Sequence, residues 1–312
     1  MKNNVFNLNE FLDRLEFGEV QELGKISMVP LMFNKKQKVK YISLAKALKK
    51  KRVEIKEVNE GGDVPKLLVI NKGRKKVLLI EGDTLEGAKQ NRVLNTSILL
   101  KKRSETIIPV SCVESGRWHY NKDHFSESDF AMPFMRKDKI NSVTNGMFKH
   151  GDKSFYYADQ SLVWDNIDKA LSLLKINSST RSFNDITKRT QIKWKDYKDH
   201  FKLLPNQRGF IFISNGKVLG MDYVSSPKVF KQVFPKLMES YLLQSVYFEK
   251  EGRNRNTKKE FQNAPDFLVA LYQAKTYRFK SPGLGYDHRI SHKTIAGNIL
   301  TYKKEVIQFS AF

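Results

Sequence analysis

The chain has 312 residues, of which 40% are hydrophobic, so it can bury a sizeable core in one or two domains. Its single cysteine excludes an internal disulfide and a cysteine-based metal cluster. No apolar run is long enough for a transmembrane helix, and the N-terminus lacks a signal-peptide core, so we expect a cytoplasmic protein without a membrane partner. The 56 Lys and Arg against 33 Asp and Glu give a net charge of +23, which favours a phosphate-bearing partner. A merely solvated, lysine-rich surface is the alternative.

Residues 1–120 are expected to form a β-rich part. The apolar spacing within 6–16 predicts a short amphipathic helix, and 26–33 is expected to be an edge strand because Pro30 cannot donate to a ladder. Ser43 is a candidate N-cap for a helix within 41–52. Strands follow in quick succession, two of them joined as a hairpin through residues 72–75: 53–58, 66–71, 76–81, 93–100 and 106–113.

Residues 121–157 are expected to form an excursion or a long loop. They mix Ser, Asp, Asn and Gly with isolated aromatic residues and show no sustained helical or strand periodicity. At most one short helix is expected among them. Loops of this length in compact proteins are often lids or linkers.

Residues 158–312 are expected to form a mixed α+β part. Helical spacing is found in 161–176 and 182–201, and Asn215-Gly216 predicts the turn of a hairpin over 209–224. Ser226-Pro227 then begins a long helix. A charged connector, 249–263, precedes a further helix and the strands 275–280, 298–304 and 305–312. The fold class is therefore α+β, with a β-rich N-terminal part packed against a mixed helix/sheet part.

Two polar clusters lie within residues 80–118, one on each side of a short apolar segment. Their members are Glu86, Lys89, Gln90, Asn91, Arg92 and Asn95 in the first, and Cys112, Glu114, Arg117 and Trp118 in the second. The apolar segments 97–100 and 107–110 read as a hairpin, which would bring both clusters to one cleft.

The residue types in these clusters fit recognition of a nucleotide. Amides such as Gln90 and Asn91 can orient a ligand or read an adenine edge, and arginines can fork a phosphate. Trp118 could stack on a base or anchor a core. In an enzymatic version, Glu86 or Glu114 would be the general base. The alternative is a tight polar turn whose hydrogen bonds are all internal.

Cys112 and the histidines carry less weight. Cys112 lies in an apolar strand and is interpreted as a packed residue, because a nucleophile would need a lowered thiol pKa. The histidines lack metal-ligand spacing, so we predict no metal site and no cofactor.

Blocks of the sequence resemble a known family. The GDTLEGAKQNR and PVSCVESGRW blocks, with the terminal strand ending in Ala311-Phe312, are similar to the ADP-ribosylglycohydrolase and rhodanese-phosphatase-associated protein domain family over about residues 17–312. Here Gly87-Ala88 replaces a double glycine. The resemblance spans both parts of the chain, which is compatible with one compact unit.

The resemblance implies NAD-derived and ADP-ribose metabolism. The leading hypothesis is therefore binding, and in an enzymatic version processing, of an ADP-ribose-like or NAD-derived nucleotide. Glu86 and Glu114 would be catalytic, and Lys89, Gln90, Asn91, Arg92, Asn95, Arg117 and Trp118 would bind the ligand. The alternatives are a basic nucleic-acid-binding protein without catalysis, and an interaction module in which residues 80–118 are structural.

Overall fold

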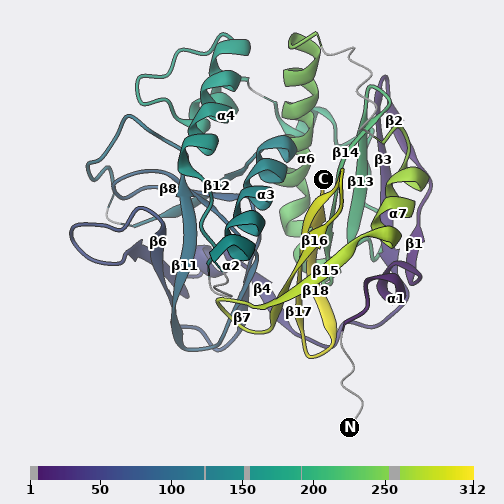
Figure 1. Ribbon diagram of the computed structural model, residues 1–312, viewed down its shortest axis with the longest axis horizontal. Coiled ribbons are helices and arrows are strands. Elements are labelled where there is room, and N and C mark those ends of the chain that lie inside the picture. The colour runs from purple at the N-terminus through teal and green to yellow at the C-terminus, as the bar shows by residue number, and fades with distance from the viewer. Residues whose placement is uncertain (1–5, 123, 151–154, 191, 253–260) are drawn as a thin grey trace.

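The computed structural model describes residues 6–122, 124–150, 155–190, 192–252 and 261–312 (Figure 1). It confirms the α+β class, with antiparallel sheets and packed helices. The basic residues of the predicted connector at positions 253, 255, 258 and 259 lie outside the described residues.

A long antiparallel sheet is built from strands within residues 15–33 and 209–311. Among the described residues it has the strand order β1-β3-β13-β14-β18-β17-β16-β15, and β2 pairs with β3 beside β1. The strands are β1 (Leu15–Phe17), β2 (Gln21–Leu23), β3 (Ile26–Phe33), β13 (Gly209–Ser214), β14 (Lys217–Val224), β15 (Lys275–Lys280), β16 (Tyr286–Ser291), β17 (Ala296–Tyr302) and β18 (Glu305–Ala311).

Two smaller sheets are built from residues 41–130. One has the order β12-β8-β9-β11-β6-β5, and the other has the order β10-β7-β4. Their strands are β4 (Tyr41–Ser43), β5 (Val53–Glu57), β6 (Lys66–Asn71), β7 (Lys76–Leu79), β8 (Asp83–Glu86), β9 (Arg92–Leu94), β10 (Ile98–Leu100), β11 (Ser104–Cys112) and β12 (Ser126–Phe130).

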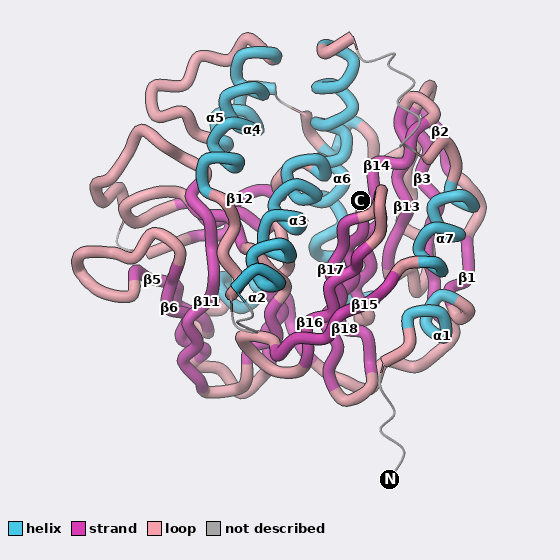
Figure 2. Tube along the Cα trace, viewed as in Figure 1, coloured by secondary structure: helices cyan, strands magenta, loops and turns pink. Residues whose placement is uncertain are grey.

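Helices fill the space between the long sheet and the six-stranded sheet, as Figure 2 shows for α3, α4 and α6. Helix α6 packs against β12 on one side and β14 on the other. The helices are α1 (Leu8–Leu12), α2 (Leu44–Lys49), α3 (Pro133–His150), α4 (Gln160–Leu173), α5 (Phe183–Thr190), α6 (Pro227–Lys250) and α7 (Ala264–Gln273), with a short 3₁₀ turn at Trp194–Asp196.

Local sequence chemistry explains several element boundaries. The Ser43 side chain accepts a hydrogen bond from the Lys46 amide and caps α2, and Ser226 caps α6 in the same way, with Pro227 in its first turn. Asn215 and Gly216 adopt positive φ angles of 50° and 68° between β13 and β14. The predicted caps and this hairpin are confirmed.

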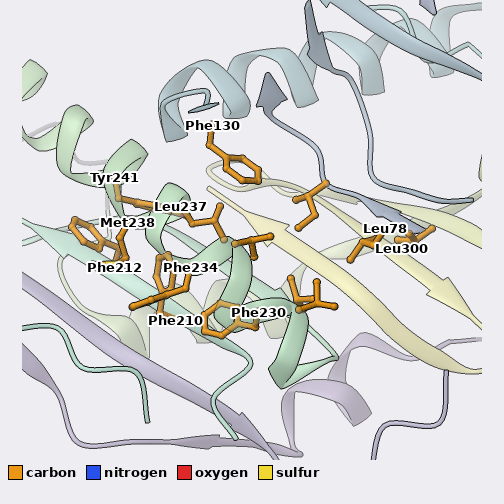
Figure 3. Close-up of a cluster of buried hydrophobic side chains, with 14 of the residues drawn as sticks. Leu78, Phe130, Phe210, Phe212, Phe230, Phe234, Leu237, Met238, Tyr241 and Leu300 are labelled. Atoms are coloured by element: carbon orange, nitrogen blue, oxygen red, sulfur yellow. The ribbon is translucent and has the colours of Figure 1, made fainter. Parts of the chain in front are cut away.

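The largest apolar cluster draws on both parts of the chain (Figure 3). Leu78 of β7 and Phe130 of β12 share it with Phe210, Tyr241 and Leu300 from the later strands and α6. Residues from before position 131 and after position 200 therefore exclude water from a common interior.

The predicted strand pairings near residues 72 and 101 are wrong. β6 lies between β5 and β11, whereas β7 pairs with β10 and β4. The reason is burial. β7 and β10 are almost wholly buried, whereas β6 and the first half of β11 alternate between buried and partly exposed positions. Strands covered on both faces pair with each other in the interior.

β3 is not an edge strand, because β13 lies on one side of it and β1 and β2 lie on the other. Pro30 is tolerated because it faces the break between β1 and β2, where its carbonyl accepts a hydrogen bond from the Gly18 amide at 2.9 Å. Its missing N–H therefore leaves no strand partner unbonded.

Residues 121–157 contain β12 and the 18-residue helix α3, where an excursion or long loop was expected. The helical period is present but hidden, because Arg136 and Lys139 occupy buried positions between Met135, Ile140 and Val143. A pattern search that counts only apolar residues misses a helix whose inward face carries charges.

Candidate functional site

The two polar clusters meet through the pairing of β9 with β11. In this ladder Arg92 is opposite Cys112 and Leu94 is opposite Val110. The Val113 amide also donates to the Asn91 carbonyl at 3.0 Å. The clusters are therefore adjacent, although the hairpin that was expected to join them does not form.

Glu114 and Arg117 form a buried ion pair that holds the turn before β9. Arg117 donates from Nε and Nη2 to Glu114 Oε2 at 3.0 and 2.7 Å, and from Nη2 to Asn91 Oδ1 at 3.2 Å. Its Nη1 donates to the carbonyls of Ala88 and His119 at 2.6 and 2.9 Å. These five bonds use every donor of the guanidinium, so Arg117 supports the turn from within the protein.

Two further contacts fix this turn. The backbone amide of Asn91 donates to Glu114 Oε2 at 3.1 Å, and the side-chain Oδ1 of Asn91 accepts from the Gly87 backbone amide at 3.2 Å. Burial acts to raise the pKa of Glu114, but hydrogen bonds from Arg117, Thr180 and the Asn91 amide hold it below its ordinary value. Glu114 is therefore ionised and committed to internal bonds.

Arg92 and Glu57 form a second buried pair with different geometry. Arg92 Nη1 donates to the Gln90 carbonyl at 2.9 Å and to Gln90 Oε1 at 3.2 Å, whereas Nη2 lies 3.6 Å from Glu57 Oε1. Within the part of the chain that the structure describes, Arg92 Nε and Nη2 and both Glu57 carboxylate oxygens lack a hydrogen bond of normal geometry. Burial raises the pKa of Glu57, although Arg92 and the Lys89 backbone amide oppose the shift.

An exposed tryptophan ring lies against Arg92, and a lysine joins it to a second exposed ring. Trp118 and Tyr120 are 46% and 49% exposed, which is high for large aromatic side chains. The Trp118 ring centre is 5.6 Å from Arg92 Cζ and 5.6 Å from Lys89 Nζ, and Lys89 Nζ is 5.3 Å from the Tyr120 ring. We call Trp118, Tyr120 and Lys89 the Trp118 cover.

The loop before β6 holds the Trp118 cover in place. Lys89 Nζ donates to the carbonyls of Glu60 and Gly61 at 2.6 and 2.9 Å. Gly62 has a φ of 78°, and a Cβ atom there would lie 3.4 Å from both the Trp118 ring and the Lys89 side chain. Its left-handed conformation lets the loop approach the cover closely.

Glu86 and Asn95 lie apart from the Arg92–Glu57 pair, whereas Cys112 is beside it, opposite Arg92 in the ladder. Glu86 forms an ion pair with Lys188 of α5 at 3.2 Å. Asn95 donates to the Tyr156 carbonyl at 2.9 Å and accepts from Ser111 at 2.8 Å. Cys112 is fully buried, and burial raises the pKa of its thiol to about 11. A thiol with this pKa is protonated at neutral pH and unsuited to nucleophilic attack.

Sequence reasoning missed Glu57, although a signal for it existed. The strand alternates so that Val53, Ile55 and Glu57 are all buried while the residues between them are not. A carboxylate at an inward position of such a strand needs a cation or a ligand, because an isolated buried charge is costly.

A second charged network was also missed, and it lies at the centre of the molecule. Arg136 of α3 donates to Glu81 Oε2 at 2.9 Å and grips Asp222 of β14 with two bonds of 2.8 and 2.9 Å. Two further donors complete the network. Lys139 donates to Glu81 at 2.5 Å, and the Tyr241 hydroxyl donates to Asp222 at 2.9 Å. All five side chains are buried and joined to one another, so the network ties α3 and α6 to the long sheet.

Comparison with known proteins identifies the family. A model of the ARG and Rhodanese-Phosphatase-superfamily-associated Protein domain, ARPP-1, matches residues 14–312. The chain belongs to this family. No curated protein and no solved structure matched the chain.

The ARPP-1 match covers both polar clusters and the central network. The family description associates ARPP-1 with ARG and with the rhodanese-phosphatase superfamily, which suggests in general terms a function related to ADP-ribose. None of the helices within the described ARPP-1 residues is long and apolar enough to cross a membrane.

Proposed function

We propose that the protein binds an ADP-ribose-like or NAD-derived nucleotide at the Arg92–Glu57 pair beneath the Trp118 cover. The observation that carries this proposal is the combination of buried, incompletely bonded charges with the exposed Trp118 ring against them. Buried polar atoms in native proteins are nearly always hydrogen-bonded, so those that are not indicate a place where a further polar group is accommodated.

The chemistry of these residues matches the parts of such a nucleotide. The Nε and Nη2 atoms of Arg92, which make no hydrogen bond among the described residues, can donate to a phosphate as a fork. A carboxylate such as Glu57 can accept hydrogen bonds from ribose hydroxyls, as acidic residues do in dinucleotide-binding folds. Trp118 and Tyr120 offer ring faces for the adenine, and Lys89 adds positive charge between them.

Access to the pair requires the Trp118 ring to move, because Arg92 is 0% exposed. Among the contacts that hold the ring are its cation contacts with Lys89 and with the buried Arg92, which contribute from about 0.5–1 kcal/mol at exposed sites to about 2 kcal/mol where the cation is desolvated. A nucleotide that stacks on the displaced ring would replace these contacts.

If the protein also processes the nucleotide, Glu57 is better suited to act as a base than the residues first expected. Glu114 Oε2 already accepts three internal bonds, and Glu86 is paired with Lys188. Neither Glu57 oxygen makes a hydrogen bond of normal geometry among the described residues, and burial raises its pKa, the direction that favours proton acceptance by a carboxylate. Catalysis by Glu86 or Glu114 stays a prediction.

Isothermal titration calorimetry with ADP-ribose, NAD and AMP tests the proposal. Trp118→Ala should weaken ADP-ribose binding by about 1–3 kcal/mol, the usual contribution of one base–aromatic stack. Glu57→Gln, which preserves side-chain shape, should weaken ADP-ribose more than AMP if it binds the second ribose. Tyr277→Ala is the matched control, because Tyr277 of β15 is an exposed aromatic residue that takes no part in the cover.

Either of two results would reject the proposal. One is a wild-type protein that gives no binding heat with any of the three nucleotides. The other is a folded Trp118→Ala variant that binds them as tightly as the wild type.

A further inference from the structure

A groove lined by positive charge lies away from the Trp118 cover. It encloses about 940 Å³ and is bordered by α1, the connection 33–38, the turn 283–286 and the turn between β17 and β18. In Figure 1, α1 and the lower end of the long sheet mark the place of the groove. Strands β6 and β11, which are near the Trp118 cover, lie at the opposite side of the molecule. The groove shares no residue with the proposed nucleotide site. We call it the basic groove.

Nine Lys and Arg side chains line the basic groove, against only Glu10 and Glu305. Among the described residues none of these nine cations has a carboxylate within ion-pair distance. Glu305 itself is occupied, because its Oε2 accepts from the backbone amides of Lys38 and Val39, each at 3.0 Å. The groove therefore presents an uncompensated positive field to solvent.

Aromatic rings alternate with the cations along the groove. Tyr286 is 47% exposed, and the Arg278 guanidinium lies 4.8 Å from its ring centre. Tyr302 has Lys303 and Lys76 at 5.7 Å from its ring, and Phe33 has Arg208 at 5.8 Å. Phe33 also stacks on Phe11 at 5.1 Å, so Tyr286 and Tyr302 are the rings left for a ligand, each with a cation over it.

The groove floor adds shape without adding charge. His288 is buried there, bonded to Thr301 Oγ1 at 2.9 Å and packed 4.7 Å from the Phe6 ring. Burial lowers the pKa of His288 to about 4, so the imidazole is neutral at physiological pH. Arg208 is buried, but the other eight lining cations are exposed and accessible to a phosphate backbone.

We propose that the basic groove binds single-stranded nucleic acid, with bases stacked on Tyr286 and Tyr302 and phosphates bound by the lysines of the 33–38 and 301–306 segments. A single nucleotide carries too few phosphates to match nine cations, whereas a strand supplies one phosphate for every base. Stacking on side-chain rings requires unpaired bases, which a duplex does not offer. This activity is additional to nucleotide binding at the Trp118 cover and does not depend on it.

Fluorescence anisotropy with labelled oligonucleotides of about 12 residues tests the proposal, since single-strand sites usually span about 4–16 nucleotides. The probes are oligo(dT), oligo(U), a DNA duplex and inorganic polyphosphate, each titrated over a range of salt concentrations. We expect the single strands to bind more tightly than the duplex, with affinity falling steeply as salt rises. Preference for oligo(U) or for oligo(dT) would identify RNA or DNA as the partner, and either supports the proposal.

Three variants assign the binding to the groove. Tyr286→Ala should weaken single-strand binding about 10-fold and leave polyphosphate binding unchanged, because polyphosphate has no bases to stack. Lys303→Gln/Lys304→Gln should weaken both and reduce the salt slope by about 1 to 2. The control, Lys49→Gln/Lys50→Gln, removes two exposed lysines from α2 and its C-cap, outside the groove, and should have little effect.

Four results would overturn the proposal. They are no single-strand binding even at low salt, tighter binding of the duplex, an equal loss of affinity in the α2 control, and a Tyr286→Ala variant that binds oligonucleotides as the wild type does. The last would leave a groove that recognises anions in general.

Discussion

Replacing Arg117 with alanine tests whether the second polar cluster supports the fold or contacts a ligand. The substitution leaves Glu114 buried with only the Asn91 amide and Thr180 as partners, and it removes the donors bonded to the carbonyls of Ala88 and His119. Breaking a buried ion pair by removing one partner costs about 3–5 kcal/mol. In a protein of this size, that corresponds to a Tm lowered by roughly 5–8 °C.

The pH dependence of the effect follows from the sign of the Glu114 shift. Because the folded-state pKa of Glu114 lies below its unfolded value, the stability it contributes is present above about pH 4.3 and is lost as pH falls through the folded-state pKa. Arg117→Ala removes part of this contribution. The difference in Tm between wild type and variant should therefore be full at pH 7 and narrow below about pH 4.

Thermal unfolding followed by circular dichroism measures this effect, with Arg181→Ala as the matched control. Arg181 also pairs with a carboxylate, Asp168, but its side chain is 58% exposed, so its loss should change Tm little. The reasoning would be refuted if Arg117→Ala melted like the Arg181→Ala control while losing affinity for ADP-ribose. In that case the guanidinium would act on the ligand.

Three further substitutions test other parts of the structure. Cys112→Ser should change ADP-ribose affinity by no more than a few-fold, and native wild-type protein should react slowly with iodoacetamide, because the thiol is buried and its pKa is raised to about 11. Gly82→Ala should lower the free energy of unfolding by about 2–5 kcal/mol in urea titrations, because Gly82 has a φ of 85° and an added Cβ would lie 2.5 Å from Arg136 Nε. Burial raises the pKa of Asp83 to about 8, so its contribution to the free energy of unfolding is lost as pH rises from about 4 through 8. Asp83→Asn should make the fall in unfolding free energy between pH 5 and pH 8 smaller, as measured by unfolding experiments at both pH values.

What could be predicted from the sequence was local. Asn215-Gly216 and Ser226-Pro227 act through their own backbone preferences, so the hairpin and the start of α6 were readable without knowledge of the rest of the fold. Strand pairing is not local in this sense. The turn at residues 72–75 is compatible with a hairpin, but burial of β7 on both faces sends it to β10 and β4 instead.

The same division applies to the candidate site. The residue types identified the neighbourhood of Arg92 and Trp118, and β9 and β11 bring the clusters together there. The sequence could not show that Arg117 uses all its donors in internal hydrogen bonds whereas Arg92 does not, since both are arginines beside amides and carboxylates. That distinction depends on which carbonyls each side chain reaches. Glu57, in contrast, could have been found from the alternation of its strand.

The central claim is that an ADP-ribose-like nucleotide binds at the Arg92–Glu57 pair, and a crystal structure of the protein grown with ADP-ribose tests it most directly. We predict electron density for the adenine against a displaced Trp118 ring, with a phosphate at Arg92 and a ribose at Glu57. Density for ADP-ribose in the basic groove, with Trp118 still over Arg92, would contradict the claim.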